Sequence, residues 1–364
     1  MATADSLPIR DDLRGQQPYG APQIDVPVRL NTNENPFAPS SAVVDSVASR
    51  VATAAATVNR YPDRDARELR TALARYVLRS TGCTADAESV WAANGSNEIL
   101  QQLLQAFGGP GRRGLGFEPT YSMHRLICRG TGTEYRSALR AADFSLTSAA
   151  AIAAVATHRP DVVFLCSPNN PTGTALGPEV IAEVYDATEA LVVVDEAYGE
   201  FSSRRSAITV LPNRPRLVVV RTMSKAFALA GARVGYAVAD PGVIEALQLV
   251  RLPYHLSSLT QAGALAALDH IDELLGRVDV LKVQRDRISD DLRSLGYRVA
   301  PSDANFVLFG GFDDQAAVWR QLVDRGVLIR DLRLPGYLRV TAGTPHETEE
   351  FLKAIRAITE ENVA

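Results

Sequence analysis

Four largely apolar runs recur in the middle of the chain, and each is followed by polar residues or a chain break. They span residues 161–166 (DVVFLC), 191–194 (LVVV), 217–220 (LVVV) and 234–238 (VGYAV). Continuous apolar runs of this length are typical of strands buried on both faces of a parallel sheet. Helical spacing at residues 178–188 separates the first two runs. Strand–helix–strand connections in series predict an α/β fold with a mainly parallel sheet covered by helices.

Other segments have helical or strand spacing as well. Helices are expected at residues 41–57, from after residue 63 through 76, and at 98–107, 242–252 and 256–295; short strands are expected at 90–93 and 114–117. Beyond residue 296 the pattern predicts strands at 297–299, 304–309, 326–330 and 337–340, with helices near 314–325 and 347–360. Residues 1–28 have no period and are rich in Pro, Gly and Gln. We therefore predict an N-terminal arm (1–28), a large domain (29–255) and a small α+β domain (256–364).

Asn170, Asp195 and Lys225 each follow one of the apolar runs. Ligands of parallel sheets bind outside the carboxyl ends of the strands. We therefore expect these three side chains to converge on one crevice.

Lys225 lies between hydroxyl residues and is followed by Gly231 and Arg233. A desolvated lysine amine is able to form a Schiff base, and Thr222, Ser224 and Arg233 are suited to holding a phosphate. Together these groups describe a site for pyridoxal 5'-phosphate (PLP). The segment alone is equally consistent with a surface lysine and arginine near a helix start, and the expected convergence favours the PLP site.

Four further residues, in three segments, also have candidate roles. Asp195 at the end of a buried strand needs a partner; a protonated pyridine nitrogen is one, and a helix N-cap role is the alternative. Ser96 and Asn97 follow Gly95 at an expected helix start, where backbone N–H groups favour anions. Tyr121 follows a strand and on its own is as typical of core or surface.

Arg330 and Arg339 lie at strand ends on either side of a short Pro/Gly loop. Arginines in such positions are usually solvated, but a pair that faces a cleft is able to bind anionic substrate groups through bidentate hydrogen bonds.

Composition narrows the class of protein. The chain is 46% hydrophobic and 22% charged, as is usual for globular proteins. Its net charge of −4 argues against a nucleic-acid or anionic-membrane partner. The three cysteines and five histidines have no metal-site spacing. We expect no metal, no signal peptide, no membrane span and a cytoplasmic location.

Taken together, the motifs resemble the fold-type I PLP-dependent aminotransferases, and within them the histidinol-phosphate aminotransferases of the actinobacterial type. The resemblance runs from about residue 18 to residue 344. It rests on residues 30–36 (LNTNENP), 60–63 (RYPD), 167–173 (SPNNPTG), 194–198 (VDEAY), 224–227 (SKAF) and 338–341 (LRVT), with 91–98 and 253–258 typical of actinobacterial members. It implies a seven-stranded, mainly parallel sheet in the large domain and a homodimer.

The resemblance also implies residue roles at the cofactor. Lys225 forms the Schiff base and shuttles a proton, Asp195 holds the pyridinium, and Tyr121 stacks on the ring. Tyr198 and Asn170 donate to the phenolic oxygen. The phosphate is held by Ser96, Asn97, Thr222, Ser224 and Arg233, together with Tyr61 of the partner subunit.

At the substrate, the resemblance implies that Arg339 holds an α-carboxylate and that Asn33 and Asn170 line the pocket. Arg330 of the same chain is expected at the substrate phosphate, together with Tyr19 from the arm of the partner subunit. The implied reaction exchanges an amino group between histidinol phosphate and 2-oxoglutarate in a ping-pong cycle, giving imidazole acetol phosphate and glutamate. One guanidinium is able to hold the distal anion of either substrate in turn.

Some positions depart from the family pattern, and alternatives remain. Asn97 replaces a common aspartate, and His255 replaces a common asparagine, so its part in substrate contact is open. An aromatic amino acid aminotransferase and an amino acid phosphate decarboxylase share this scaffold. A PLP-binding regulator would need a DNA-binding module that residues 1–28 do not supply, and a nicotinamide dehydrogenase would need a GxGxxG turn.

Overall fold

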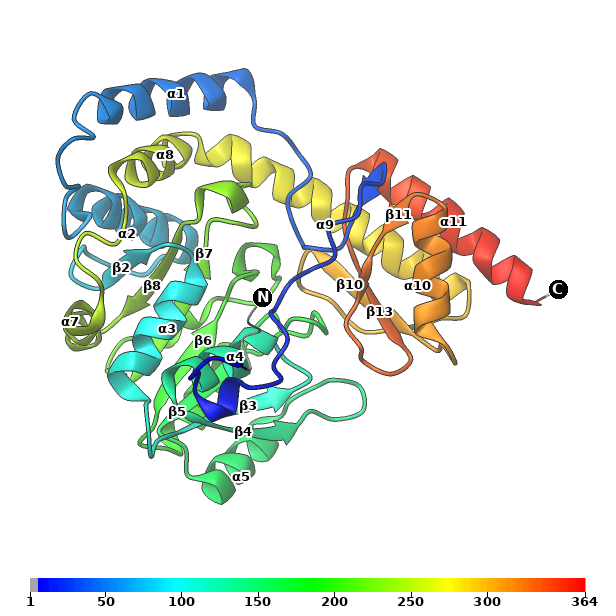
Figure 1. The fold of residues 1–364 in the computed structure, drawn as a ribbon, viewed down its shortest axis with the longest axis horizontal. Helices are drawn as coiled ribbons and strands as arrows, with labels where there is room; N and C mark the ends of the chain where they lie inside the picture. The colour runs from blue at the N-terminus through cyan, green and yellow to red at the C-terminus, as the bar shows by residue number, and fades with distance from the viewer. Residues whose placement is uncertain (1–5, 364) are drawn as a thin grey trace.

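A seven-stranded sheet forms the centre of the large part of the molecule (Figure 1). The structure is a computed structural model that describes residues 6–363; residues 1–5 of the predicted arm and Ala364 lie outside that range. The strand order is β2-β8-β7-β6-β5-β3-β4. The bounds are β2 Val90–Ala93, β3 Arg113–Glu118, β4 Glu134–Leu139, β5 Val162–Cys166, β6 Leu191–Asp195, β7 Leu217–Thr222 and β8 Gly235–Ala239. β8 runs antiparallel to both of its neighbours, β2 and β7, and the other pairs of the sheet are parallel, so the predicted mainly parallel sheet is confirmed.

The sheet is buried on both faces because its central strands carry apolar side chains on alternate sides. Val192 and Val194 belong to one apolar cluster, whereas Val193 between them belongs to a second cluster on the other face. The second cluster is covered by α3 (Ser96–Phe107), α4 (Ser122–Thr131) and α7 (Pro241–Val250). The first is covered by α2 (Arg67–Thr81), α5 (Ser148–His158) and α6 (Pro178–Asp186).

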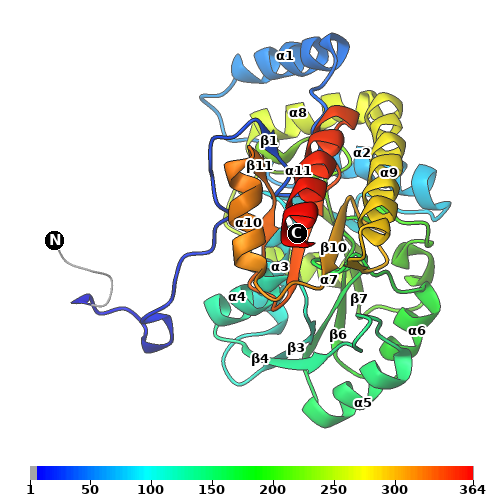
Figure 2. The same cartoon turned by 90° about the vertical axis from the view of Figure 1, so that its right-hand side faces the viewer.

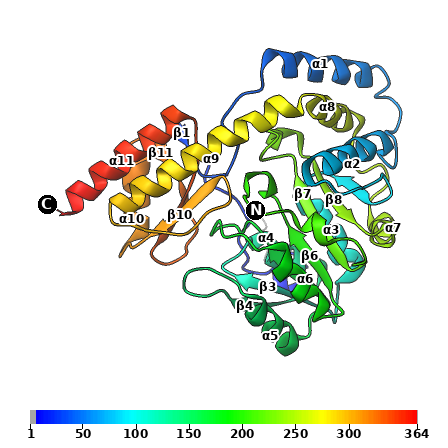
Figure 3. The same cartoon turned by 180° about the vertical axis from the view of Figure 1, so that it is seen from behind.

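A smaller antiparallel sheet, with order β12-β13-β10-β9, lies beside the large one. Its strands are β9 Arg298–Val299, β10 Phe306–Gly310, β12 Arg330–Asp331 and β13 Tyr337–Thr341, and its helices are α10 (Gln315–Asp324) and α11 (Pro345–Val363). The expected long helix at 256–295 is divided at His270 into α8 (Ser258–Asp269) and α9 (Ile271–Ser294). Figure 3 shows α9 running from α8 to the smaller sheet. Helix α1 (Ser41–Ala55) packs on α8.

The segment at residues 28–29, where the large domain was predicted to begin, pairs with a strand of the C-terminal part. Strand β1 (Val28–Arg29) pairs in parallel with β11 (Val327–Leu328), so the segment that follows the arm joins the C-terminal part. The boundaries at residues 28 and 255 stay predictions. The predicted strand at 326–330 is two short strands, β11 and β12, which belong to different sheets.

The region between residues 119 and 160 contains the elements that the pattern did not reveal. Strand β4 is the edge of the sheet, and its side chains are exposed or half-buried. Its polar residues therefore give no apolar run. The arm, which includes a 3-10 turn at Asp11–Leu13, extends to one side of the other elements in Figure 2. It touches the end of α4, where Arg10 donates to the carbonyls of Arg129 and Gly130 at 2.7 and 3.1 Å.

Among residues 6–363, no helix has the length and apolar character that crossing a bilayer requires. The same residues contain no group of three potential metal-ligand side chains.

Two leucines of α2 test the core assignment. Leu73 is fully buried, and Leu78 is 49% exposed on the same helix. Leu73→Ala is expected to lower the free energy of unfolding by about 2–5 kcal/mol, because it leaves a cavity. Leu78→Ala, the matched control, is expected to change it by about 0.5 kcal/mol or less. Urea denaturation followed by circular dichroism measures both; equal effects would contradict the packing of α2.

Candidate active site

The carboxyl ends of β5, β6 and β7 meet at one edge of the large sheet, as the sequence predicted. Asp195 is the last residue of β6, and Asn170 and Lys225 lie in the loops that follow β5 and β7. The segment of residues 31–33 lies beside these strand ends and forms hydrogen bonds with Lys225 and Tyr198. The Nζ of Lys225 donates to the carbonyl of Thr32 at 3.0 Å, and the side-chain amide of Asn33 donates to the hydroxyl of Tyr198 at 2.9 Å.

Lys225 has the environment of a nucleophilic amine. Burial lowers the pKa of its amine to about 8, and the nearby guanidinium of Arg339 acts in the same direction. The chain contains only two other lysines, Lys282 and Lys353. Each lies within 3.5 Å of a carboxylate one helical turn away on its own helix. The structure therefore singles out Lys225 as the lysine suited to capturing an aldehyde.

Hydroxyl, guanidinium and backbone groups form a cradle beside Lys225. Thr222 donates to the hydroxyl of Ser224 at 3.0 Å, and Arg233 donates to the same hydroxyl at 3.3 Å. The N-terminus of α3 lies next to them. A Cβ at Gly235 would lie 2.3 Å from the backbone nitrogen of Ser96, and a Cβ at Gly95 would lie 2.6 Å from Nη2 of Arg233. Glycine is therefore required at both positions for this close approach.

Asp195 is 2% exposed, and its carboxylate has a partner that the sequence analysis did not assign. Its Oδ2 lies 3.0 Å from Nε2 of His124, while its Oδ1 accepts from the backbone N–H of Ala197 at 3.2 Å. The imidazole of His124 stacks on Phe164 and meets the ring of Tyr121 edge-on. Asp195 is not a helix N-cap, because the 3-10 helix that follows, Gly199–Phe201, is capped by Tyr198. One oxygen of Asp195 forms a local turn contact, and the other contacts a buried imidazole.

The missed residue has a recognisable signal in hindsight. His124 lies three residues after Tyr121, and both are at the start of α4, so they project from the same side of that helix. The hydroxyl of Tyr121 donates to Oδ1 of Asn97 at 3.3 Å, which links this ring to the cradle. Burial raises the pKa of Tyr121, and burial raises the pKa of Tyr198 to about 12, so both phenols are protonated at neutral pH.

The two predicted arginines lie side by side in the smaller sheet. Arg330 and Arg339 are opposite each other in the β12–β13 pair. Arg339 is buried; it donates to Oδ1 of Asn170 at 2.6 Å and to the carbonyl of Asn31 at 2.9 Å. The buried Nε of Arg339 and Nη1 of Arg330 have no hydrogen-bond partner among residues 6–363. Burial lowers the pKa of Arg339 to about 10.

Two predicted residues are not at the cradle of this chain. Tyr61 is 79% exposed and stacks on Tyr254, with ring centroids 4.3 Å apart. Its contact with a partner subunit stays a prediction. Tyr19 was expected from the partner's arm, but here the chain's own arm approaches its own site. The carbonyl of Gly20 accepts from Nη2 of Arg330 at 3.2 Å, and Tyr19 is close enough to Tyr121 and Arg339 to influence their pKa values.

His255, whose part in substrate contact was left open, has two contacts within the protein. Its ring stacks on Trp91 with centroids 5.2 Å apart, and its Nε2 lies 2.9 Å from the carbonyl of Ala92. These contacts hold the loop of residues 253–257 against β2.

The donor set fits the expected cofactor. A half-buried amine, a buried carboxylate, an aromatic ring and a phosphate-sized group of hydroxyl, guanidinium and backbone donors all face the same strand ends. This combination matches the aldehyde, pyridine nitrogen, ring and phosphate of PLP.

Comparison with known proteins agrees with this chemistry. The profile of the family "Aminotransferase class I and II" matches residues 25–355, so the chain belongs to that family. A histidinol-phosphate aminotransferase of Frankia casuarinae is 63% identical over 97% of this chain and 90% of that protein. One of Streptomyces avermitilis is 59% identical over 99% of both. Within the family, the chain belongs with the histidinol-phosphate aminotransferases.

Solved structures support the same fold. The histidinol-phosphate aminotransferase of Sinorhizobium meliloti in complex with pyridoxal-5'-phosphate superposes with a TM-score of 0.81 at 27% identity, covering 92% of each chain. Thermus thermophilus aspartate aminotransferase with maleate has a TM-score of 0.80 at 23% identity, covers 92% of each chain, and shows the fold alone.

The pKa of Lys225 generates a direct prediction. Only a neutral amine reacts with acetic anhydride, so a lowered pKa moves its reaction to lower pH. In cofactor-free protein we expect half-maximal labelling of Lys225 near pH 8. Lys353, whose pKa is raised first by its hydrogen bond to Glu350, is the internal control and should label at higher pH. Peptide mass spectrometry measures both; coincident midpoints would contradict the assignment.

Proposed function

We propose that this protein transfers an amino group between histidinol phosphate and 2-oxoglutarate, forming imidazole acetol phosphate and glutamate, as a PLP-dependent step of histidine biosynthesis. The relatives named for this activity, at 59–63% identity over nearly the whole chain, support the proposal. The observation that carries it is the pair of adjacent guanidiniums, Arg330 and Arg339, each with a buried N–H directed to no acceptor among the described residues.

PLP supplies an aldehyde for imine exchange and a ring that takes up the electron pair of the substrate's α-carbon. The chain's own residues supply proton transfer and orientation. Burial lowers the pKa of Lys225 to about 8, so its Nζ is more readily deprotonated than an exposed lysine and is suited to accepting the α-proton and returning it. Its position at the end of β7 holds that nitrogen above the strand ends.

Asp195 stabilises a proton on the ring nitrogen, because a buried carboxylate favours a nearby positive charge. His124 holds the carboxylate in place through its 3.0 Å contact. Tyr198 and Asn170 are proposed to donate to the ring oxygen, and Tyr121 to cover the ring. Ser96, Asn97, Thr222, Ser224 and Arg233 are proposed to hold the phosphate.

The substrate's distal anion is proposed to bind Arg330, with Tyr19 of the arm beside it and Asn33 lining the pocket. Arg339 is proposed to bind the α-carboxylate of glutamate through its free Nε. Histidinol phosphate has no such carboxylate, so the phosphate contact at Arg330 supplies more of its affinity. Both half-reactions then share one pocket.

The proposed active unit is a cytoplasmic homodimer in which Tyr61 of the partner subunit reaches the cofactor phosphate. The rigidly stacked and exposed ring of Tyr61 supports this proposal, because an exposed aromatic side chain is suited to an interface. The net charge of −4 supports small-molecule substrates without a nucleic-acid or membrane partner.

A steady-state comparison of amino donors with 2-oxoglutarate as acceptor tests the function. Histidinol phosphate is expected to give a higher kcat/KM than phenylalanine, because only the phosphate ester supplies a distal anion for Arg330. Lys225→Ala, as the control, should lose turnover and the absorbance of the lysine-linked cofactor while remaining folded. A strong preference for phenylalanine would favour an aromatic aminotransferase, and carbon dioxide release without 2-oxoglutarate would reveal a decarboxylase.

Arg330→Ala tests the anion site. Loss of one charge-assisted contact is expected to weaken apparent binding of histidinol phosphate and of glutamate by about 1.5–3 kcal/mol, roughly tenfold to a hundredfold in KM. Arg333→Ala, which removes an exposed guanidinium from the same loop, is the matched control and should leave KM unchanged. An unchanged KM for histidinol phosphate in Arg330→Ala would show that another group holds its phosphate.

A further inference from the structure

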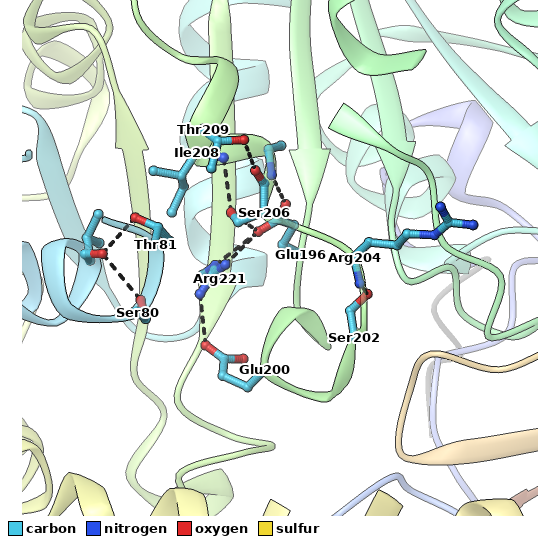
Figure 4. Close-up of polar contacts among 12 residues, drawn as sticks. Ser80, Thr81, Glu196, Glu200, Ser202, Arg204, Ser206, Ile208, Thr209 and Arg221 are labelled. Carbon is cyan, nitrogen blue, oxygen red and sulfur yellow. Dashed lines mark hydrogen bonds and ion pairs between the residues drawn. The ribbon is translucent and has the colours of Figure 1, made fainter. Parts of the chain in front are cut away.

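A buried ion cluster, drawn in Figure 4, lies at the carboxyl ends of β6 and β7, which also carry Asp195 and Lys225. Arg221, the fifth residue of β7, donates to Oε2 of Glu196 from both Nε and Nη2, at 3.1 and 2.8 Å. Its Nη1 donates to Oε1 of Glu200 at 3.1 Å. The three side chains are only 4–5% exposed. Nothing in the proposed reaction uses them.

The cluster joins the two segments that hold the reacting groups. Glu196 lies between Asp195 and Tyr198, and Arg221 precedes Lys225 by four residues. Glu196 also accepts from the backbone N–H of Ala207 at 2.5 Å and from the hydroxyl of Ser206 at 2.7 Å. The carboxylate is therefore surrounded by donors that fix its position.

The turn around Tyr198 packs closely on the guanidinium. A Cβ at Gly199 would lie 3.2 Å from Nη2 of Arg221 and 3.3 Å from Oε2 of Glu196. The backbone N–H of Gly199 donates to the carbonyl of Glu196 at 2.9 Å, which closes the turn that contains Tyr198. A shift of the Arg221–Glu196 pair is thus transmitted to the residue next to Tyr198.

We propose that the Arg221–Glu196 pair is a positioning device that fixes Asp195 and Tyr198 relative to Lys225. The proposal rests on the proposed function, because it assigns these three residues to the cofactor. The pair acts through Asp195 and Tyr198 and does not itself contact the reacting atoms.

The two carboxylates of the cluster differ in a way that provides a matched control. Glu200 accepts from Arg221 and from the hydroxyl of Tyr76 at 3.1 Å through Oε1, but its buried Oε2 has no partner among residues 6–363. Burial raises the pKa of Glu200. Glu200→Gln is therefore able to keep both acceptor contacts and place its NH2 where no donor opposes it.

Glu196→Gln also replaces a carboxylate by an amide, but at a position where both oxygens accept hydrogen bonds. An NH2 in place of Oε1 would face the N–H of Ala207, and an NH2 in place of Oε2 would face two N–H groups of Arg221. Either orientation sets donors against each other and displaces the turn. Gly199→Ala displaces the guanidinium by a few tenths of an ångström without altering any charge.

The experiment follows the absorbance of the lysine-linked cofactor with pH and measures the pH at which half of it is deprotonated. Below their unfolding temperatures, it compares the cofactor-loaded wild type with Glu196→Gln, Glu200→Gln and Gly199→Ala. Tyr198 donates to the deprotonated form of the cofactor and favours it, so its displacement raises the midpoint. Glu196→Gln should raise it by about one pH unit and lower kcat by about tenfold to a hundredfold with less change in KM. Gly199→Ala should shift it in the same direction, and Glu200→Gln should match the wild type.

Two results separate the possible failures. A wild-type protein that acquires no lysine-linked cofactor absorbance would overturn the proposed function, and this inference with it. A loaded wild type with unchanged midpoints in both Glu196→Gln and Gly199→Ala, or an equal shift in Glu200→Gln, would overturn the positioning role alone. If Glu196→Gln does not fold, Gly199→Ala against Glu200→Gln decides the question.

Discussion

Parallel hydrogen bonding between β5, β6 and β7 fixes where the chemistry of this protein takes place. In this ladder Cys166 lies opposite Asp195, and Asp195 lies opposite Val220. The residues that follow each strand therefore leave the sheet at nearly the same level. Because a one-residue slip in register would direct every side chain to the opposite face, the position of the carboxylate relative to the amine of Lys225 is set by backbone pairing and by the apolar side chains that bury it.

Two kinds of buried arginine lie close to this edge, and their partners explain their different roles. Arg221 contacts two carboxylates, so its charge is more than neutralised. Arg339 contacts an amide oxygen and a backbone carbonyl, which carry no net charge. The positive charge of Arg339 thus remains available to an anionic ligand, whereas that of Arg221 is used within the fold.

Sequence alone predicted the part of the site that depends on strand ends. Asn170, Asp195 and Lys225 were recognisable because continuous apolar runs precede them, and the structure brings their strands together. Arg330 and Arg339 were recognisable as a pair beside a short loop, but the predicted strand-end positions were wrong, because Arg330 is the first residue of β12 and Arg339 is the third of β13. His124 was missed because residues 119–160, which contain an exposed edge strand, give no strong period. The contact between Gly20 and Arg330 was also missed, since an arm without periodicity gives no indication of where it lies. The partner contacts of Tyr61 stay predictions because they involve a second chain.

The carbonyl of Gly20 on Nη2 of Arg330 has a consequence for how ligand affinity is interpreted. In the proposed site, an anion that binds through Nη2 has to displace this carbonyl, whereas one that binds through Nη1, which has no partner among residues 6–363, does not. The dissociation constant of the first kind of ligand would include the release of the arm, and that of the second would not. In the proposed pocket, the arm would thus act as an internal competitor for one face of the guanidinium.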